Sequence, residues 1–288
     1  MSSQPFVWVI TGCSTGVGRE MAIAALKRGD KVIATTRAES FHKIKDLTPL
    51  GADILTLDVT SSLDELKQIA TQAVAIYGHV DAVVNNAGFV LSGSYEETTH
   101  EDTLTQFNTN VFGALNVSRA FLPHMRSRRS GTIAFIGSCW GWIGVSFVGL
   151  YVASKFALRG ISETLHYEIA PFGLQSLCFD SGCFRTPVLA KIERTINIPD
   201  YKEAGEAHDA MRKSFDGAQR GDPVRGSNAI IDIIKGEGLA AGKKIPVNGF
   251  AIGVDAYGTV KKSAEDVLER LEEWKEVTLS TDYPENSK

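Results

Sequence analysis

Short apolar segments rich in β-branched residues alternate with longer helical patterns, and this alternation constrains the fold of the chain more than any other feature. Strands are predicted over residues 7–11, 31–35, 54–57, 82–85, 132–137 and 175–179. Helices are predicted over residues 17–28, 63–77, 101–125 and 152–170. Continuous apolar strands separated by helices are typical of a parallel sheet that is covered on both faces. The pattern therefore predicts an α/β fold.

The alternation stops after Gly182 for about forty residues, and a segment of that length without a strand is usually a binding loop or lid. Residues 183–225 are therefore predicted to be a substrate-binding lid, and residues 256–276 form an amphipathic pattern typical of a surface helix. No repeat, low-complexity tract or linker divides the chain. We expect one domain over 1–288, with a core over 6–187 and a C-terminal helix and tail over 250–288.

Composition excludes several classes of protein. The 288 residues are 43% hydrophobic and 22% charged with a net charge of -4, which indicates neither a disordered chain nor a basic nucleic-acid binder. The apolar run at residues 6–10 is too short for a membrane span or a signal sequence. The four cysteines form no CxxC pair and no metal-type spacing with the histidines. We expect a cytoplasmic protein without a metal ion, a membrane span or a nucleic-acid partner.

A glycine-rich sequence, Thr11-Gly12-Cys13-Ser14-Thr15-Gly16-Val17-Gly18, lies between the first predicted strand and the first predicted helix. Glycines let a backbone turn tightly and approach a diphosphate, and a helix N-terminus offers N–H groups and a partial positive charge. An ordinary strand-to-helix turn is the alternative. The order of strand, loop and helix favours the binding of a dinucleotide.

A second motif joins Ser138 to Tyr151 and Lys155. Positions i and i+4 share one face of a helix, so Lys155 is predicted to lie alongside Tyr151. A cationic lysine stabilises a phenolate, which makes a tyrosine a better acid near neutral pH. Ser138, at the end of a predicted strand, is placed to hydrogen-bond a substrate oxygen. Taken alone, the Tyr-Lys pair is as expected of a surface helix, so the surrounding motifs decide its meaning.

These motifs, with Asn85-Asn86-Ala87-Gly88, resemble the short-chain dehydrogenase/reductase superfamily over residues 6 to 187. The extended tail is similar to that of fungal and bacterial oxidoreductases of the superfamily. The resemblance implies a single-domain Rossmann-type doubly wound parallel sheet with strand order 3-2-1-4-5-6-7. It also implies a catalytic tetrad of Asn110, Ser138, Tyr151 and Lys155, in which Asn110 supports a water that connects Lys155 to solvent. The alternative for Asn110 is a polar helix residue without a catalytic role.

The cofactor-binding residues that the resemblance implies are Gly12, Ser14, Thr15, Gly16, Val17, Gly18, Arg37, Asp58, Val59, Asn86, Ala87, Gly88, Tyr151, Lys155, Gly182 and Thr186. Relatives that use NAD carry an acid at the end of the second strand, whereas this chain has Thr36 and Arg37 there. A guanidinium can pair with a 2′-phosphate, so NADP (NADPH) is favoured and NAD is less expected. Asp58 is assigned either to the adenine or to a cap of the helix that begins near Leu63.

Two departures from the family pattern stand out. Where relatives have Pro-Gly after the sixth strand, this chain has Ser181-Gly182, and the replacement predicts looser placement of the nicotinamide with the same class of reaction. The C-terminal third is also expected to lack the short strand and glycine-rich ending that many tetrameric relatives use to build one interface. A homodimer through the helices at 101–125 and 152–170 and a monomer both remain open.

The residues around the motifs predict an apolar substrate. Residues 139–150, between Ser138 and Tyr151, are rich in aromatic and aliphatic side chains, as are residues 89–91 after the Asn85–Gly88 motif. The leading interpretation is a carbonyl reductase or alcohol dehydrogenase acting on a hydrophobic ketone or secondary alcohol. A lyase, epimerase or cyclase on the same scaffold and a non-catalytic NADP-binding sensor are the alternatives. The sequence assigns no physiological substrate, direction or stereochemistry.

Overall fold

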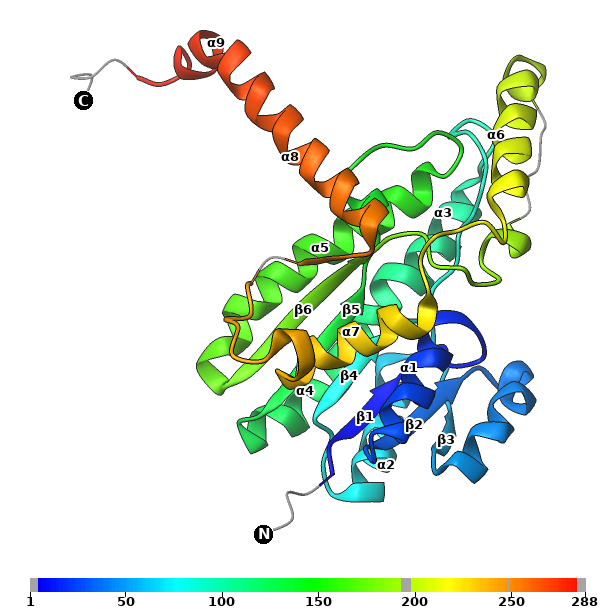
Figure 1. The fold of residues 1–288 in the computed structure, drawn as a ribbon, viewed down its shortest axis with the longest axis vertical. Helices are drawn as coiled ribbons and strands as arrows, with labels where there is room; N and C mark the ends of the chain where they lie inside the picture. Colours follow the sequence, from blue (N-terminus) through cyan, green and yellow to red (C-terminus); the bar gives the residue numbers. More distant parts are fainter. Residues whose placement is uncertain (1–4, 193–197, 248, 284–288) are drawn as a thin grey trace.

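Seven parallel strands form one sheet in the computed structural model, which describes residues 5–192, 198–247 and 249–283 (Figure 1). The strand order is β3-β2-β1-β4-β5-β6-β7, so the predicted fold class and topology are confirmed. The strands are β1 (Val7–Ile10), β2 (Lys31–Thr36), β3 (Asp53–Thr56), β4 (Ala82–Asn85), β5 (Gly131–Ile136), β6 (Leu174–Ser181) and β7 (Phe250–Ile252). The order reverses between β1 and β4, and such a switch point leaves a crevice at the carboxyl ends of the strands.

Helices cover both faces of this sheet. One face packs against α1 (Gly16–Lys27) and α7 (Pro223–Lys235), which lie side by side. The other face packs against α2 (Leu63–Tyr77), α4 (Ala114–Arg128) and α5 (Gly149–Ile169). The predicted helices at 17–28, 63–77 and 152–170 therefore match α1, α2 and α5 to within three residues.

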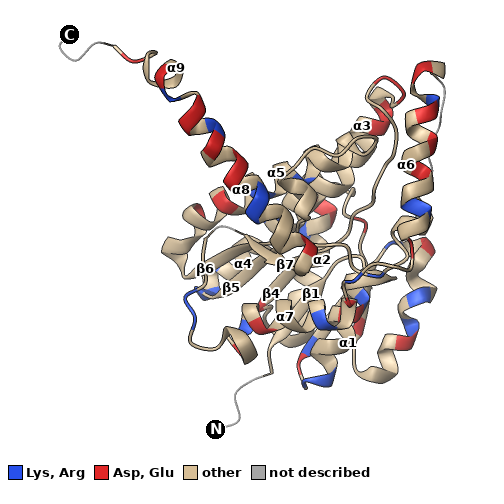
Figure 2. Ribbon diagram, turned by 45° about the horizontal axis from the view of Figure 1, so that its top comes forward, with Lys and Arg blue, Asp and Glu red and all other residues tan. Residues whose placement is uncertain are grey.

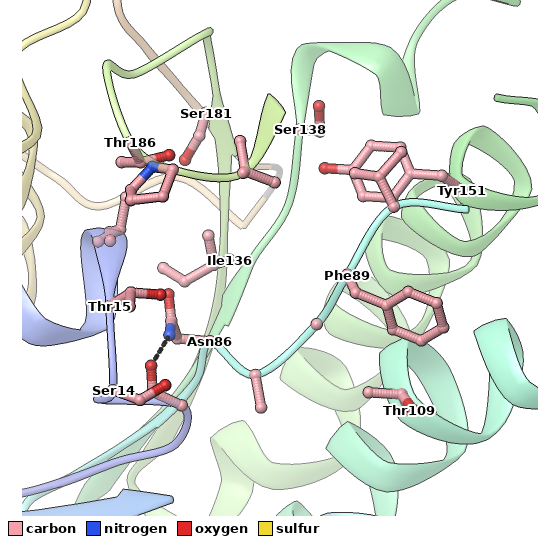
Figure 3. Close-up of a pocket in the computed structure, with 18 of the residues that line it drawn as sticks. Ser14, Thr15, Asn86, Phe89, Thr109, Ile136, Ser138, Tyr151, Ser181 and Thr186 are labelled. Carbon is pink, nitrogen blue, oxygen red and sulfur yellow. Dashed lines mark hydrogen bonds between the residues drawn. The ribbon is translucent and has the colours of Figure 1, made fainter. Parts of the chain in front are cut away.

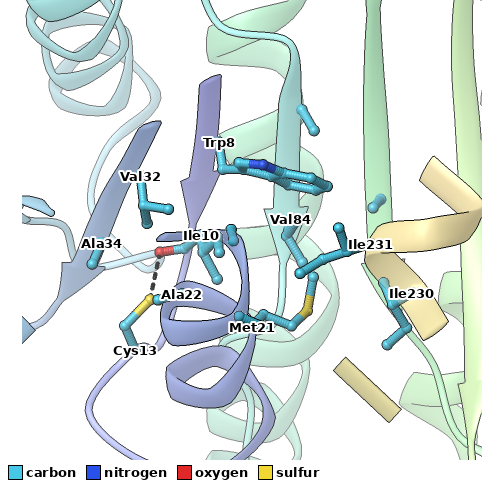
Figure 4. Close-up of a cluster of buried hydrophobic side chains, with 14 of the residues drawn as sticks. Trp8, Ile10, Cys13, Met21, Ala22, Val32, Ala34, Val84, Ile230 and Ile231 are labelled. Carbon is cyan, nitrogen blue, oxygen red and sulfur yellow. Dashed lines mark hydrogen bonds between the residues drawn. The ribbon is translucent and has the colours of Figure 1, made fainter. Parts of the chain in front are cut away.

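The strands feed two apolar cores because successive side chains point to opposite faces of a sheet. Trp8 and Ile10 of β1 pack with Met21 of α1 and with Ile230 and Ile231 of α7 (Figure 4). The intervening Val7 and Val9 join the core on the opposite face, with side chains of α2, α4 and α5. Burial on both faces explains why the strands read as continuous apolar runs.

A buried carboxylate, Asp30, connects β1 and α7 at the edge of the first core. Its Oδ2 accepts a hydrogen bond from Trp8 Nε1 at 3.0 Å, and its Oδ1 lies 3.0 Å from Lys235 Nζ. Asp30 is 7% exposed, and burial of a carboxylate is tolerated when it is paired in this way. The pair fixes the end of α7 against the sheet.

The single helix predicted over 101–125 has three parts. It begins as α3 (His100–Phe107), continues through a π-helical turn over Asn108–Gly113, and becomes α4, which runs on to Arg128. A Cβ at Gly113 would lie 2.8 Å from the carbonyl oxygen of Val59, so this turn passes very close to the segment after β3. The wider turn places Asn110 inward, as described below.

The C-terminal third differs most from prediction. The segment 183–225 has no strand among its described residues, as expected, but it contains α6 (Lys202–Phe215) and the start of α7; residues 193–197 lie outside the described part. The expectation that this third lacks a short strand is wrong, because β7 pairs with β6. The terminal helix predicted over 256–276 is α8 (Val254–Glu273), followed by the short α9 (Lys275–Leu279).

Candidate active site

A cavity of about 750 Å³ opens where the strands end, and the loops that follow β1 to β6 line it (Figure 3). Of the predicted site residues, those in the lining are Gly12, Ser14, Thr15, Gly16, Val17, Arg37, Asp58, Val59, Asn86, Ala87, Gly88, Ser138, Tyr151, Lys155, Gly182 and Thr186. Gly18 and Asn110 lie behind this lining. The structure thus brings residues from seven separate segments to one cavity.

The glycine loop turns sharply between β1 and α1. Gly12 has φ +72° and Gly16 has φ +66°, and residues with a Cβ rarely adopt this region. The N-terminus of α1 follows at Gly16 and faces the cavity with Ser14 and Thr15. Backbone N–H groups and the helix dipole at this point are suited to a diphosphate. Cys13, inside the loop, is fully buried, and burial raises the pKa of its thiol to about 12, which supports a packing role.

The segment after β4 is bound tightly to this loop. Asn86 Nδ2 donates to the carbonyl oxygens of Thr11 at 2.8 Å and of Gly12 at 3.3 Å (Figure 3). The Thr11 hydroxyl accepts from the backbone N–H groups of Asn86 and Ala87, both at 3.0 Å. Gly18 has a structural reason to be glycine, because a Cβ there would lie 2.3 Å from Asn86 Nδ2. The two segments form one preformed wall of the cavity.

Arg37 follows β2 and Asp58 follows β3, so both lie at the end of the cavity beneath the β3 edge of the sheet, away from Tyr151. The Arg37 side chain is largely exposed, and its Nε lies 2.9 Å from Glu39 Oε1. Asp58 Oδ1 accepts from the backbone N–H and the hydroxyl of Thr60, at 2.9 and 2.7 Å. Ser62, not Asp58, caps α2, so the capping alternative for Asp58 is wrong. The sequence did not point to Ser40, which also lines this end.

Ser138 and Tyr151 lie at the other side of the cavity (Figure 3), and Lys155 also lines it. Ser138 follows β5, and its Oγ accepts from the backbone N–H of Trp140 at 3.2 Å. Tyr151 lies in the first turn of α5, one turn before Lys155, whose Nζ is 5.4 Å from the centre of the tyrosine ring. Lys155 Nζ donates to the carbonyl oxygen of Ile136 at 2.7 Å. This bond uses one of the three ammonium protons and leaves two for other partners.

Burial dominates the electrostatics of this group. Burial lowers the pKa of Lys155 from 10.5 to about 8, while the negative charges of Cys178 and Asp180 would oppose that fall. Burial also raises the pKa of Tyr151 well above its usual range, and a hydrogen bond with Ser138 opposes the rise. A protonated phenol beside a lysine that still carries its charge at neutral pH is a suitable proton donor.

Asn110 supports the site from behind. Its Nδ2 donates to the carbonyl oxygen of Phe89 at 3.0 Å and to Ser154 Oγ at 3.1 Å, and its Oδ1 accepts from the N–H of Phe89 at 3.1 Å. Ser154 Oγ in turn donates to the carbonyl oxygen of Tyr151 at 2.7 Å. Asn110 therefore links the segment after β4 to the first turns of α5. Its predicted role in holding a water beside Lys155 stays a prediction.

The turn after β6 is closely packed. Ser181 ends β6 beside Ile252 of β7 and is buried, and the N–H of Gly182 donates to the carbonyl oxygen of Ile252 at 2.8 Å. A Cβ at Gly182 would lie 1.9 Å from an oxygen of Asp255, so a larger residue there would displace the carboxylate that accepts from the N–H of Cys183. Thr186 follows and lines the cavity. Strand pairing holds Ser181 in place where relatives carry proline, and the predicted looseness of the nicotinamide stays a prediction.

The segment that follows is closed at its base. The N–H of Arg185 donates to the carbonyl oxygen of Gly221 at 2.8 Å, and Phe184 pairs with Gly221 in an isolated bridge. The Phe184 ring also packs against Gly226, where a Cβ would lie 2.4 Å from a ring carbon. Residues 185–220 therefore leave and rejoin the fold at one point beside the cavity.

One group of functional relevance escaped the sequence interpretation. Asp180, 1% exposed in β6, accepts a hydrogen bond from Trp142 Nε1 at 2.7 Å. The guanidinium of Arg159 stacks 3.5 Å from the centre of the Trp142 ring and lies 3.9 Å from Asp180. Burial raises the pKa of Asp180, and these donors oppose the rise. The network anchors the loop between Ser138 and Tyr151, and the signal was a lone acid in an apolar strand.

The residues present fit a nicotinamide dinucleotide. The glycine loop offers a cradle without Cβ atoms for the diphosphate, Asp58 and Arg37 lie where an adenosine would extend, and Lys155 lies beside the tyrosine. Among the described residues, no cluster of His, Cys, Asp and Glu side chains is suited to a metal ion. Within the same part of the chain, no helix combines the length and apolar character needed to span a bilayer.

Comparison with known proteins agrees with this geometry. The model of the short chain dehydrogenase family matches residues 7–197, more than half of the chain. The chain belongs to the short-chain dehydrogenase/reductase family. It is an oxidoreductase of the NAD(P)-dependent kind that is typical of this family.

Three relatives illustrate the range of the family. Oxidoreductase BOA17 of Botryotinia fuckeliana is 31% identical over 284 residues, which cover 96% of this chain and 98% of the relative. The 3-ketodihydrosphingosine reductase of Bacteroides thetaiotaomicron is 37% identical over 185 residues, or 64% of this chain and 65% of the relative. A short-chain dehydrogenase of Streptomyces avermitilis has a crystal structure that covers 98% of this chain and 100% of its own, with 34% identity and a TM-score of 0.85.

Proposed function

We propose that this protein transfers a hydride between NADPH and a hydrophobic ketone or secondary alcohol, as a carbonyl reductase or alcohol dehydrogenase. One observation carries the proposal: Ser138, Tyr151 and Lys155 line the same cavity as the glycine loop and Arg37. Carbonyl reduction needs both a group that donates a proton and a cradle for a dinucleotide. A protein that only binds the dinucleotide has no need of the proton donor.

In the reducing direction, NADPH supplies the hydride that reaches the carbonyl carbon. The Tyr151 hydroxyl donates its proton to the carbonyl oxygen, which yields the alcohol and leaves a phenolate. The Lys155 ammonium, with two protons free of Ile136, stabilises that phenolate and holds the ribose hydroxyls. Ser138 Oγ accepts from Trp140 and also hydrogen-bonds with Tyr151, so a carbonyl oxygen placed between the two hydroxyls would receive the Ser138 O–H and be polarised by it.

The preference for NADPH rests on Arg37. Its guanidinium lies at the cavity and is exposed. Among the described residues, its ion-pair partner is Glu39. A 2′-phosphate carries more charge than this carboxylate and accepts bidentate bonds from a guanidinium. Asp58 and Val59 line the adjoining wall, where an adenine ring would lie.

The preference for an apolar substrate rests on the opposite wall. The apolar side chains that line the cavity include Phe89, Val90, Trp140, Phe184, Val188 and Leu189. Trp140 packs edge-on against Tyr151, with ring centres 6.0 Å apart. The relative named as a 3-ketodihydrosphingosine reductase supports a ketone with a long apolar part, and the segment 183–225 is the part of the chain proposed to close over it.

The first experiment compares the wild type with Tyr151→Phe on a panel of hydrophobic ketones, following NADPH absorbance, with NADPH binding measured in parallel by calorimetry. The variant is expected to lose about 10²-fold to 10⁴-fold in kcat while binding NADPH almost as well. Wild-type turnover by Tyr151→Phe would overturn the mechanism. If the protein binds NADPH tightly but no ketone in the panel causes NADPH to be oxidised, the non-redox or sensor alternatives would be favoured.

The second experiment measures the ratio of kcat/KM with NADPH to that with NADH. Arg37→Gln is expected to lower this ratio about tenfold through KM for NADPH, since one charged hydrogen-bonding partner is lost. Glu39→Gln is the matched control, and it is expected to raise the ratio because the phosphate no longer competes with a carboxylate. An unchanged ratio in both variants would remove Arg37 from cofactor selection without affecting the assignment of Tyr151.

A further inference from the structure

The C-terminal helix α8 projects from the body of the protein, and its outer part packs against no other element in the described part of the chain (Figure 1). At its base, Asp255 Oδ2 accepts from the backbone N–H of Cys183 at 2.6 Å, and Ser263 Oγ donates to the carbonyl oxygen of Trp142 at 2.9 Å. Beyond Ser263, every residue from 264 to 283 is exposed. A lone helical segment of this length is marginal in water, so a partner is expected to stabilise it.

An apolar stripe runs along this unsupported helix. Its members recur at intervals of three and four residues, as on one face of an α-helix: Tyr257, Val260, Ala264, Val267, Leu268, Leu271 and Trp274. Leu268, Leu271 and Trp274 are 65%, 52% and 55% exposed. From Lys262 on, the opposite face of α8 carries the charged residues Lys262, Asp266, Glu269 and Glu273. A helix that is apolar on one face only is suited to pairing with another helix through that face.

Charge along the helix indicates which partner fits. At the base of α8, Asp255 is bound to the N–H of Cys183, and the other charged side chains up to residue 264 are Lys261 and Lys262, whereas residues 265–276 carry six acidic and two basic side chains. Figure 2 shows this change from blue near the base to red toward the tip. A second copy of α8 in antiparallel orientation would place the basic base of each helix beside the acidic tip of the other. A parallel copy would bring like charges together, and an anionic membrane would repel the acidic tip.

The stripe has the same self-complementarity. Pairing about the point between Val267 and Leu268 puts the small Ala264 opposite Leu271 of the second copy. It puts Lys261 opposite Trp274 of the second copy, within one helical turn of Glu272. The twenty residues of α8 span about 30 Å, which leaves room for one body at each end. The geometry points to an antiparallel pair of α8 helices that joins two copies of this chain.

The test compares masses by light scattering after size exclusion, at micromolar protein. The wild type is expected to have twice the mass of Leu268→Glu/Leu271→Glu, in which two charges replace the centre of the stripe. Glu273→Gln, on the charged face, is the matched control and is expected to keep the wild-type mass. Circular dichroism reports whether each variant remains folded.

Charge exchange tests the orientation. Lys261→Glu is expected to weaken the pair at least tenfold, and Lys261→Glu/Glu272→Lys is expected to restore it. A wild-type monomer, or a mass that the Leu268→Glu/Leu271→Glu change leaves intact, would overturn the proposal. Binding of the wild type, but not of that variant, to phosphatidylcholine/phosphatidylserine vesicles would also overturn it, in favour of a membrane surface.

Discussion

Replacing Lys155 by methionine is expected to stabilise the protein while abolishing its activity. The side chain is 7% exposed, and burial lowers its pKa from 10.5 to about 8. A depressed lysine pKa means that the folded state holds the charge at a cost, which is about 3 kcal/mol below pH 8 at 1.36 kcal/mol per pKa unit. Methionine has a similar length and no charge. The loss of the bond to the Ile136 carbonyl offsets about 1 kcal/mol, so a net gain of about 2 kcal/mol remains at pH 7.

The gain is expected to depend on pH in one direction only. Between pH 8 and 10.5 the unfolded chain still binds the lysine proton and the folded chain does not, so wild-type stability rises with pH in this window. The advantage of Lys155→Met therefore shrinks from about 2 kcal/mol at pH 7 to nearly zero at pH 9.5. Urea denaturation of the cofactor-free protein at four pH values between 7 and 9.5 measures it.

Lys235→Met is the matched control, because it is expected to change the free energy of unfolding in the opposite direction. Hydrogen bonding to Asp30 raises the pKa of Lys235 despite burial, so that cation stabilises the fold. Its removal leaves a buried carboxylate without an ion pair and is expected to cost about 2 kcal/mol, evenly across pH 7 to 9.5. A Lys155→Met protein that is less stable than the wild type at pH 7, or whose difference from it does not vary with pH, would refute the reasoning.

Three further predictions concern the supports of the site. Gly18→Ala puts a Cβ 2.3 Å from Asn86 Nδ2, so we expect a loss of about 1–3 kcal/mol in urea denaturation and a clear rise in KM for NADPH; unchanged values would show that the wall yields. Trp142→Phe removes the donor 2.7 Å from buried Asp180 and should cost about 1.5–3 kcal/mol at pH 8. The cost should fall as the pH is lowered, because burial raises the pKa of this carboxyl and favours its protonation; a cost that does not vary with pH would contradict this. Asn110→Leu removes three hydrogen bonds and should lower both the melting temperature and kcat, whereas a loss of kcat alone would indicate a direct catalytic role.

Local signals explain which elements the sequence predicted well. Helix α2 matches its prediction at both ends because Ser62 and Glu65 form a capping box and Gly78 ends the helix in a left-handed conformation. The glycine loop was equally clear, since Gly12 and Gly16 fall between a strand and a helix. Helix α7 carries comparable signals in Asp222, which caps it, and Gly236, but the prediction of a lid through residue 225 obscured them.

Other features depend on contacts between distant residues and have no local signal. Strand β7 has three residues, of which only Ile252 is buried, so no alternation could be read from it. The motifs singled out Asn110, but its bonds to Phe89 and Ser154 exist only because a π-helical turn faces the end of β4. Asp180 could be seen as unusual, yet Trp142, its partner, was assigned to the substrate side.

The closed base of the segment over residues 185–220 has a consequence for how such enzymes diversify. Its two ends meet at Phe184 and Gly221, so a different insert of any length could be spliced there without altering the sheet or the helix that carries Tyr151. Thr186, Val188 and Leu189 of this segment line the cavity, so exchanging the segment would change the part of the cavity that follows β6, while the glycine loop and the helix that carries Tyr151 keep their sequence. The same junction is a natural grafting point for an engineer who wants a new specificity on an existing reductase.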